Sequence, residues 1–104
     1  MVKNIDKLTQ IFSSLSDETR LKIVISLMDN PKNVNEIFEA IGQNITLSAV
    51  SHQLKQLTQV GLLVPKKEGR ERRYTLSQDF CWCIVKKGLN HYSAGHKCKC
   101  SKTE

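Results

Sequence analysis

The sequence contains no apolar stretch long enough to span a bilayer, which argues against a transmembrane helix. Its start, from Met1 to Gln10, alternates polar and apolar residues and lacks the basic segment and apolar block of a signal peptide. We therefore expect a cytoplasmic protein with no membrane partner. Because the cytoplasm is reducing, the four cysteines are predicted to be thiols or metal ligands rather than structural disulfides.

Arrangements of residues that carry out catalysis are also missing. There are no paired carboxylates in a plausible cleft, no glycine-rich loop that would cradle a phosphate, and no Ser-His-Asp arrangement. Ser51 and His52 are neighbours in a predicted helix, so their side chains do not face each other. We therefore expect that the protein is not an enzyme.

Charge is unevenly distributed along the 104 residues, a length that suits one small domain. Residues 1–45 hold five Lys or Arg and six Asp or Glu, a net charge of −1, whereas residues 46–104 hold eleven and four, a net charge of +7. A basic half favours a polyanionic partner, with nucleic acid the first candidate. A domain this short buries only a modest fraction of its surface, so we also expect a partner subunit.

Apolar residues recur at helical spacing in most of the chain. The spacing predicts a helix over residues 3–14, a second that Ser16 caps and Asn30-Pro31 ends, and a third over residues 34–41 that stops at Gly42. Thr46 is a plausible cap for a helix that runs through Gln59. Ser77 is the predicted cap of a last helix that ends near Tyr92.

A β-hairpin is predicted between the last two helices. Residues 62–67 and 72–76 form its strands, Pro65 indicates an edge position, and Glu68-Gly69-Arg70 is the turn. The segment from Lys66 to Arg73 holds five cations and two acids, a net charge of +3. The tip of the hairpin is therefore basic.

This order predicts a mainly α fold with a small β-hairpin, a winged helix-turn-helix of about five helices plus a two-stranded wing. Residues 1–93 form the DNA-binding and dimerisation domain, and residues 94–104 a flexible tail that contains cysteine. The second helix of such a pair lies in the major groove, and wing cations contact the DNA backbone or the minor groove. The predicted DNA-binding residues are therefore Leu47, Ser48, Ala49, Ser51, His52, Gln53 and Lys55 in the helix, and Lys66, Lys67, Arg70, Arg72 and Arg73 in the wing. The alternative is that these are ordinary surface residues of a solvated helix and hairpin.

Three segments resemble the ArsR/SmtB family of repressors. The run from Leu15 through Ser-Asp-Glu-Thr-Arg-Leu-Lys-Ile resembles the family's second helix, and Leu47-Ser-Ala-Val-Ser-His-Gln-Leu-Lys-Gln-Leu resembles its recognition helix. Gly61-Leu-Leu-Val, Lys67-Glu-Gly-Arg and Tyr74-Thr-Leu resemble its wing, so the likeness spans roughly residues 5–92. The resemblance implies a homodimeric repressor, joined through its first and last helices, that binds an imperfect palindromic operator and releases it when an inducer binds. It also implies that Ser48, Ser51 and His52 face the DNA bases.

Four cysteines in two Cys-x-Cys pairs are the predicted sensing residues, namely Cys81 with Cys83 and Cys98 with Cys100. Thiolates favour soft ions, so the candidate inducers are Zn(II), Cd(II), Cu(I) and arsenite, As(III). Inside a helix, residues two apart point about 200° apart, so Cys81 and Cys83 can chelate one ion together only if the helix start frays. From Cys81 to Tyr92 is about 17 Å along a helix, so we expect a site shared across the dimer, with His91 or His96 as a possible extra ligand.

The predicted function is thus a DNA-binding repressor of a metal- or metalloid-resistance or homeostasis operon, released by a thiophilic ion. Two alternatives remain open. The cysteines could form a thiol-redox switch, or the protein could be a winged-helix regulator without a metal inducer, in which one of Cys81 and Cys83 is a small buried hydrophobe and the tail pair has no role.

Overall fold

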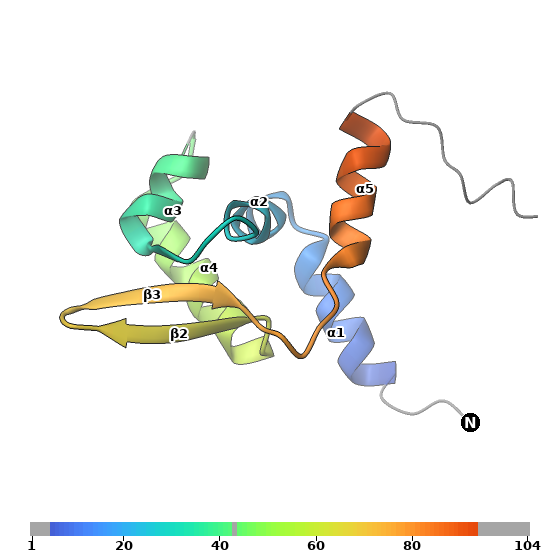
Figure 1. The fold of residues 1–104 in the computed structure, drawn as a ribbon, viewed down its shortest axis with the longest axis horizontal. Helices are drawn as coiled ribbons and strands as arrows, with labels where there is room; N and C mark the ends of the chain where they lie inside the picture. The colour runs from blue at the N-terminus through green and yellow to red at the C-terminus, as the bar shows by residue number, and fades with distance from the viewer. Residues whose placement is uncertain (1–4, 43, 94–104) are drawn as a thin grey trace, which may run out of the picture.

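The computed structural model of the protein describes residues 5–42 and 44–93, which form five helices and a small antiparallel sheet (Figure 1). The predicted fold class is confirmed. None of the helices in these described ranges combines the length and apolar character needed to cross a bilayer. In chain order the elements are α1 (Ile5–Leu15), α2 (Glu18–Ser26), β1 (Lys32–Asn33), α3 (Val34–Ile41), α4 (Leu47–Val60), β2 (Leu63–Glu68), β3 (Glu71–Leu76) and α5 (Cys83–Ser93).

The boundary between α1 and α2 differs from the prediction by one residue. Asp17, not Ser16, caps α2, because its extended backbone lets its carboxylate accept from the Arg20 N–H at 3.1 Å. The Ser16 hydroxyl instead donates to the Ser13 carbonyl at 2.8 Å, where α1 ends. Helix α2 stops at Ser26, well before the Asn30-Pro31 signal, and the next residues turn toward β1.

Capping residues position α3 and α4, and of these the Thr46 cap of α4 was predicted from the sequence. Asn33 and Glu36 form a reciprocal capping box at the start of α3, and the Thr46 hydroxyl accepts from the Ala49 N–H at the start of α4. Gly42 ends α3 with a negative φ, so it is not required for a left-handed turn. It is required because an added Cβ would lie 2.2 Å from the Phe38 carbonyl oxygen.

The core lies where α2, α3 and α4 meet the base of the hairpin, and this packing holds α4 in place. Its buried apolar members come from six elements and the turn residues beside them: Ile11, Leu15, Ile23, Val24, Leu27, Ile37, Val50, Leu54, Leu57, Leu62, Leu63 and Tyr74. On α4, Val50, Leu54 and Leu57 are fully buried, whereas Leu47 is 41% exposed.

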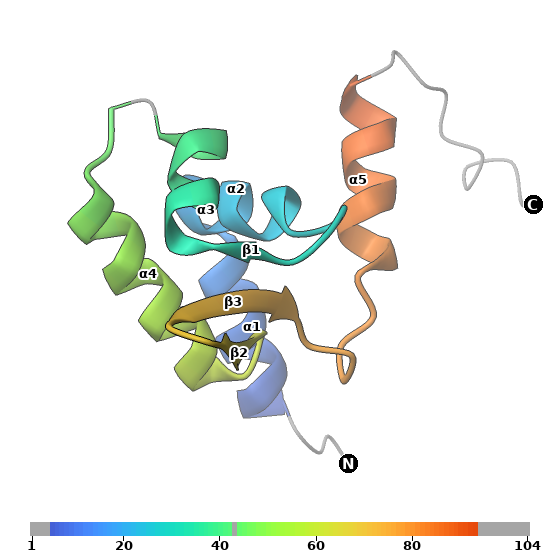
Figure 2. The same ribbon diagram turned by 60° about the vertical axis from the view of Figure 1, so that its left-hand side comes forward.

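The sheet has one strand more than predicted. The two-residue β1 pairs with β3, which gives the order β1-β3-β2 and leaves β2 at an edge (Figure 2). The edge position expected from Pro65 is therefore confirmed. Gly69, with φ of 63°, occupies the first position of the two-residue turn between β2 and β3, where a left-handed conformation favours glycine.

The last helix begins at Cys83, six residues after its predicted cap. Ser77 is buried, and its hydroxyl accepts from the Asp79 N–H at 3.1 Å, which closes a turn rather than a helix. Phe80 and Trp82 then pack against the core with their rings edge to face, 4.7 Å between centroids. Helix α5 stands at the end of the molecule opposite the tip of the hairpin (Figure 1).

Candidate nucleic-acid interface

The exposed face of α4 meets the hairpin in a hollow of about 460 Å³. Four of the predicted DNA-binding residues of α4 line it, and Arg72 of β3 lies on its other side. Hydroxyl, imidazole and cationic groups are thus gathered on one surface. The residues of α4 are Ser48, Ser51, His52 and Lys55, all exposed.

Gln53 is turned away from this hollow toward α2. Its side-chain oxygen accepts from Arg20 Nε at 2.6 Å, and the Gln56 oxygen accepts from Arg20 Nη2 at 2.7 Å. Arginine has only donors, so the amide oxygens must face it and the NH2 groups must point away. The role of Arg20 was not predictable from the sequence, because no local pattern indicates a contact across more than thirty residues.

The register of the hairpin sorts its cations onto two faces. Lys67 lies opposite Arg72, and Lys66 lies opposite Arg73. Because successive side chains in a strand point to opposite faces, Lys67 and Arg72 lie on the face that borders the hollow with α4. Lys66 and Arg73 lie on the other face, and Arg70 is exposed in the turn at the tip.

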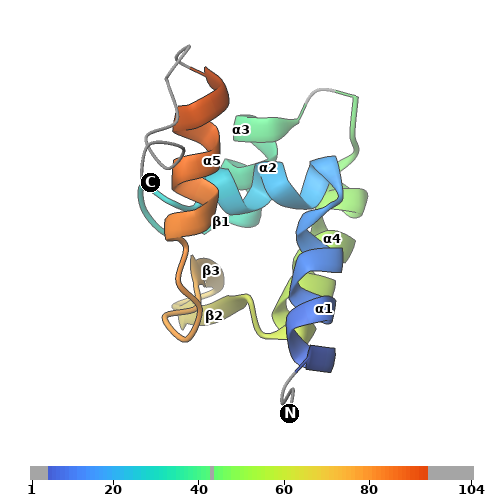
Figure 3. The same ribbon diagram turned by 90° about the vertical axis from the view of Figure 1, so that its right-hand side faces the viewer.

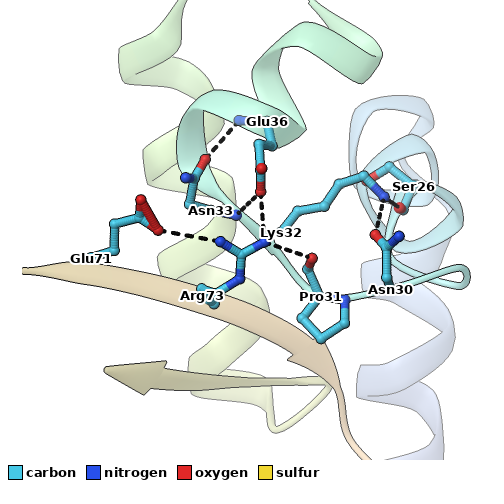
Figure 4. A network of polar contacts seen from close by, with 8 residues as sticks. All are labelled: Ser26, Asn30, Pro31, Lys32, Asn33, Glu36, Glu71 and Arg73. Atoms are coloured by element: carbon cyan, nitrogen blue, oxygen red, sulfur yellow. Dashed lines mark hydrogen bonds and ion pairs between the residues drawn. The ribbon is translucent and has the colours of Figure 1, made fainter. Parts of the chain in front are cut away.

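Arg73 is the centre of a network that joins β3 to α3 (Figure 4). Its guanidinium donates to Glu36 at 2.9 Å, to Glu71 at 3.2 Å and to the Pro31 carbonyl at 3.2 Å. Nearby, the Lys32 ammonium donates to the carbonyl of Ser26 at the end of α2 and to Asn30. Whether Arg73 contacts DNA remains a prediction, but its donors already have partners within the protein.

Cys81 and Cys83 lie closer together than predicted. Cys81 precedes α5 and Cys83 is its first residue, so the divergence expected inside a helix does not apply. Both are exposed free thiols, and their sulfur atoms are 3.0 Å apart. The prediction that both residues lie inside the last helix was therefore wrong, because α5 begins only at Cys83.

The contact between the two thiols shifts their pKa values in opposite directions. Hydrogen bonds from the Cys83 thiol and from the Cys83 backbone N–H lower the pKa of Cys81, and Lys87 lowers it further. The pKa of Cys83 is raised, first by the same hydrogen bond and then by the negative charge of Cys81. Cys81 is thus the first of the two to become a thiolate.

Of the other predicted metal ligands, only His91 lies within the described residues, and it is not brought to this pair. His91 lies in the last turn of α5, about 12 Å along the axis from Cys83. Cys98, Cys100 and His96 lie outside the described residues. Among the residues that the structure does describe, no group of three or more His, Cys, Asp or Glu could hold a metal ion.

An apolar groove of about 400 Å³ is lined by residues of α5 and of α1 and α2. Figure 3 shows how these three helices are arranged. Phe12 on the rim of the groove is 47% exposed, and Ile84 is 56% exposed. Ile5 and Leu8 extend the exposed apolar surface along α1. The lining residues are Phe12, Leu15, Leu21, Ile84, Val85, Gly88 and Leu89.

Comparison with known proteins identifies the family. Residues 17–64 match the model of the bacterial regulatory protein arsR family. The HTH-type transcriptional regulator NmtR of Mycobacterium tuberculosis is 37% identical over 78 residues, which cover 75% of this chain and 63% of NmtR. The transcriptional activator HlyU of Vibrio cholerae is 34% identical over 77 residues, which cover 74% of this chain and 69% of HlyU.

Comparison of the fold with solved structures indicates the same family. A solved structure of HlyU from Vibrio cholerae superposes with a TM-score of 0.78 at 29% identity, and the match covers 88% of this chain and 98% of that one. The chain therefore belongs to the ArsR family of bacterial transcriptional regulators.

Proposed function

We propose that the protein is a cytoplasmic, homodimeric repressor that binds an imperfect palindromic operator and releases it when a thiophilic ion binds its cysteines. The observation that carries the DNA-binding part is the hollow between α4 and the hairpin. It gathers Ser48, Ser51, His52 and Lys55 beside Arg72, all outside the core. The repressing role and the inducer follow from the family resemblance and from the cysteines.

The groups in the hollow suit the two tasks of a DNA-binding surface. Ser and His side chains at the start of α4 carry donors and acceptors that can contact base edges in the major groove. Lys55 and the hairpin cations Lys67 and Arg72 suit phosphate contacts, which supply affinity and position rather than sequence choice. Operator sequence is then read mainly by α4.

The apolar groove beside α5 supports the proposed dimer. Phe12 and Ile84 expose large apolar side chains on either side of it, and such a surface is costly to leave in water. A second copy that packs its own α1 and α5 against the first would cover both groove rims. The two α4 helices would then meet successive turns of one duplex.

The Cys81–Cys83 pair supports the proposed inducer. Two exposed thiols that already converge offer two soft ligands without rearrangement of the protein. Cys98 and Cys100 are proposed as the remaining ligands, from the same or the other subunit. An ion held at the start of α5 would act on the helix proposed for the dimer interface, and so on the spacing of the two α4 helices.

A titration tests this function. The reduced protein is first used to select a duplex from a random-sequence library, and its binding to the labelled, selected duplex is followed by fluorescence anisotropy at fixed salt. Cu(I), Zn(II), Cd(II) and arsenite are then added in turn. At least one ion is expected to release the duplex, with a rise in Kd of about tenfold or more.

Two variants serve as controls for the titration. Cys81→Ser/Cys83→Ser and Cys98→Ser/Cys100→Ser are each expected to bind the duplex but to lose release by the ion. Duplex binding that no ion weakens would contradict the inducer and leave a regulator without a metal inducer. Failure to select any duplex would contradict the function itself.

A further inference from the structure

Cys81 and Cys83 flank Trp82, the only tryptophan of the chain. Their sulfur atoms are 3.0 Å apart and both are exposed, so a small solute can reach them. A disulfide has a sulfur–sulfur distance of about 2.05 Å, so about 1 Å of closure would join the two sulfurs. The described part of the chain brings no other pair of thiols together.

Trp82, the residue between the two thiols, is linked to the hairpin by hydrogen bonds. Trp82 Nε1 donates to the Ser77 carbonyl at 2.8 Å, and the Ser77 N–H donates to the Leu62 carbonyl at 2.9 Å. Ser77 directly follows β3, and Leu62 lies between the end of α4 and the start of β2. Two hydrogen bonds therefore connect the Trp82 ring to the junction of α4 with the hairpin.

Trp82 is also tied to α5. Its carbonyl accepts from the N–H groups of Val85 at 3.1 Å and Lys86 at 3.2 Å, which form the first turn of the helix. A change in the backbone between Cys81 and Cys83 would therefore act on the start of α5 as well as on the Trp82 ring.

We propose that Cys81 and Cys83 form a dithiol modification site that hydrogen peroxide converts to a disulfide, and that Trp82 and Ser77 pass this closure to the hairpin. The effect on DNA rests on the proposed function, whereas the chemistry of the pair does not. No metal ion and no residue of the tail takes part in it.

The reaction needs one peroxide for each pair. One sulfur, as a thiolate, attacks a peroxide oxygen and the O–O bond breaks, which gives a sulfenic acid and hydroxide. The second sulfur then attacks the sulfenic sulfur, the S–S bond forms, and hydroxide leaves and takes up a proton to become water. Two thiols and one hydrogen peroxide thus yield one disulfide and two waters.

The Cys98→Ser/Cys100→Ser variant tests the chemistry, because it retains only this pair. Treatment with hydrogen peroxide is expected to remove both free thiols, and peptide mapping is expected to find a disulfide within one chain between Cys81 and Cys83. Adding Cys83→Ser to this variant should stop the reaction at a sulfenic acid on Cys81 that dimedone traps. Thiols that survive peroxide, or a disulfide only between chains, would overturn the proposal.

Trp82 fluorescence and DNA binding test the transmission. Oxidation of the same variant is expected to change the Trp82 emission and to raise the Kd for the selected duplex by about tenfold, and dithiothreitol should reverse both. A disulfide that leaves emission and Kd unchanged would overturn the transmission. The two proposals fail differently, because absence of duplex binding by the reduced protein contradicts the proposed function, whereas the thiol count does not depend on DNA.

Discussion

Arg72 and Arg73 are neighbours in β3, yet the structure gives them different surroundings. Arg72 is exposed and borders the hollow beside α4, whereas the Arg73 side chain is 27% exposed and has carboxylate partners on α3 and β3. The exposed charge beside α4 and the charge that holds the hairpin to α3 therefore lie on adjacent residues.

Exchanging each arginine for alanine should separate the two roles. Arg72→Ala is expected to weaken duplex binding and to reduce the salt dependence of log Kd by about one unit of slope, because one phosphate contact is lost. Its free energy of unfolding should change by less than about 0.5 kcal/mol. Anisotropy over a series of salt concentrations measures the slope.

Arg73→Ala is the matched control. It is expected to lower the free energy of unfolding by no more than about 1 kcal/mol, since its partner Glu36 is 46% exposed and solvent screens the pair. The salt slope should stay near the unsubstituted value. Equal effects of the two variants on the slope would contradict the assignment of faces.

The two thiols should differ in their pH dependence. Because hydrogen bonds lower the pKa of Cys81 and raise that of Cys83, Cys81 is the first of the two thiols to lose its proton as the pH rises. Iodoacetamide at neutral pH is therefore expected to alkylate Cys81 first, and the preference should fade as pH rises through the pKa of Cys83. Mass spectrometry of brief reactions measures the ratio, and preferential labelling of Cys83 would contradict the direction of the shifts.

At the scale of elements, Arg20 is the polar link between α2 and the candidate recognition helix. One guanidinium holds the oxygens of Gln53 and Gln56, which lie three residues apart on one flank of α4. Apolar contacts in the core hold the two helices together, and this planar group restricts their relative rotation.

A double-mutant cycle measures this link. Arg20→Met and Gln53→Ala are each expected to lower stability, and their combination should cost less than the sum, with a coupling energy of about 0.5–3 kcal/mol. Gln59→Ala, on the exposed side of the same helix, is the control and should add to Arg20→Met without coupling. Additive effects of Arg20→Met and Gln53→Ala in chemical denaturation would contradict the link.

Elements with a strong local pattern were predictable from the sequence. The range of α3 agrees with the prediction because its apolar spacing and Gly42 indicate the same helix. The cap of α4 agrees because Thr46 directly precedes a run with apolar residues at helical spacing. The start of α5 was not predictable, because Ser77 has the residue type of a cap. Where α5 begins depends on the packing of Phe80 and Trp82 against the core, which no local sequence pattern indicates.

The candidate site was predictable in composition but not in arrangement. Residue type indicated Ser48, Ser51, His52 and the hairpin cations as exposed polar groups. The division of the hairpin cations between two faces could not be predicted without the strand register. Gln53 points away from the hollow because it accepts a hydrogen bond from Arg20 on another helix, which no local pattern indicates. The convergence of Cys81 and Cys83 was missed because it depends on where α5 begins.

At the scale of the whole molecule, the dimer should depend on the groove beside α5. Phe12→Glu and Ile84→Glu each place a charge on exposed apolar surface at its rim, and are expected to shift the protein from dimer to monomer in sedimentation equilibrium. Duplex affinity should fall with the dimer, because one α4 helix then binds alone.

Val64→Glu is the control for this experiment. Val64 is also a large exposed apolar residue, at 43%, but it lies on β2, away from the groove. It should leave the sedimentation behaviour unchanged. A dimer that persists in both groove variants would contradict an interface through α1 and α5.

Pro65 has a further effect at this scale. Because the hairpin turn has two residues, Glu68 and Glu71 form the hydrogen-bonded pair that closes it. Hydrogen-bonded and non-hydrogen-bonded pairs alternate along an antiparallel ladder, so Pro65 and Tyr74 form a pair without hydrogen bonds. The Pro65 nitrogen therefore faces the open edge of β2. Because proline has no N–H, it cannot donate a hydrogen bond to the carbonyl of another strand at this position. With Lys66 and Lys67 beside it, this edge is a poor template for intermolecular β-pairing. Many copies can then bind close together on DNA without their hairpins forming an intermolecular β-sheet.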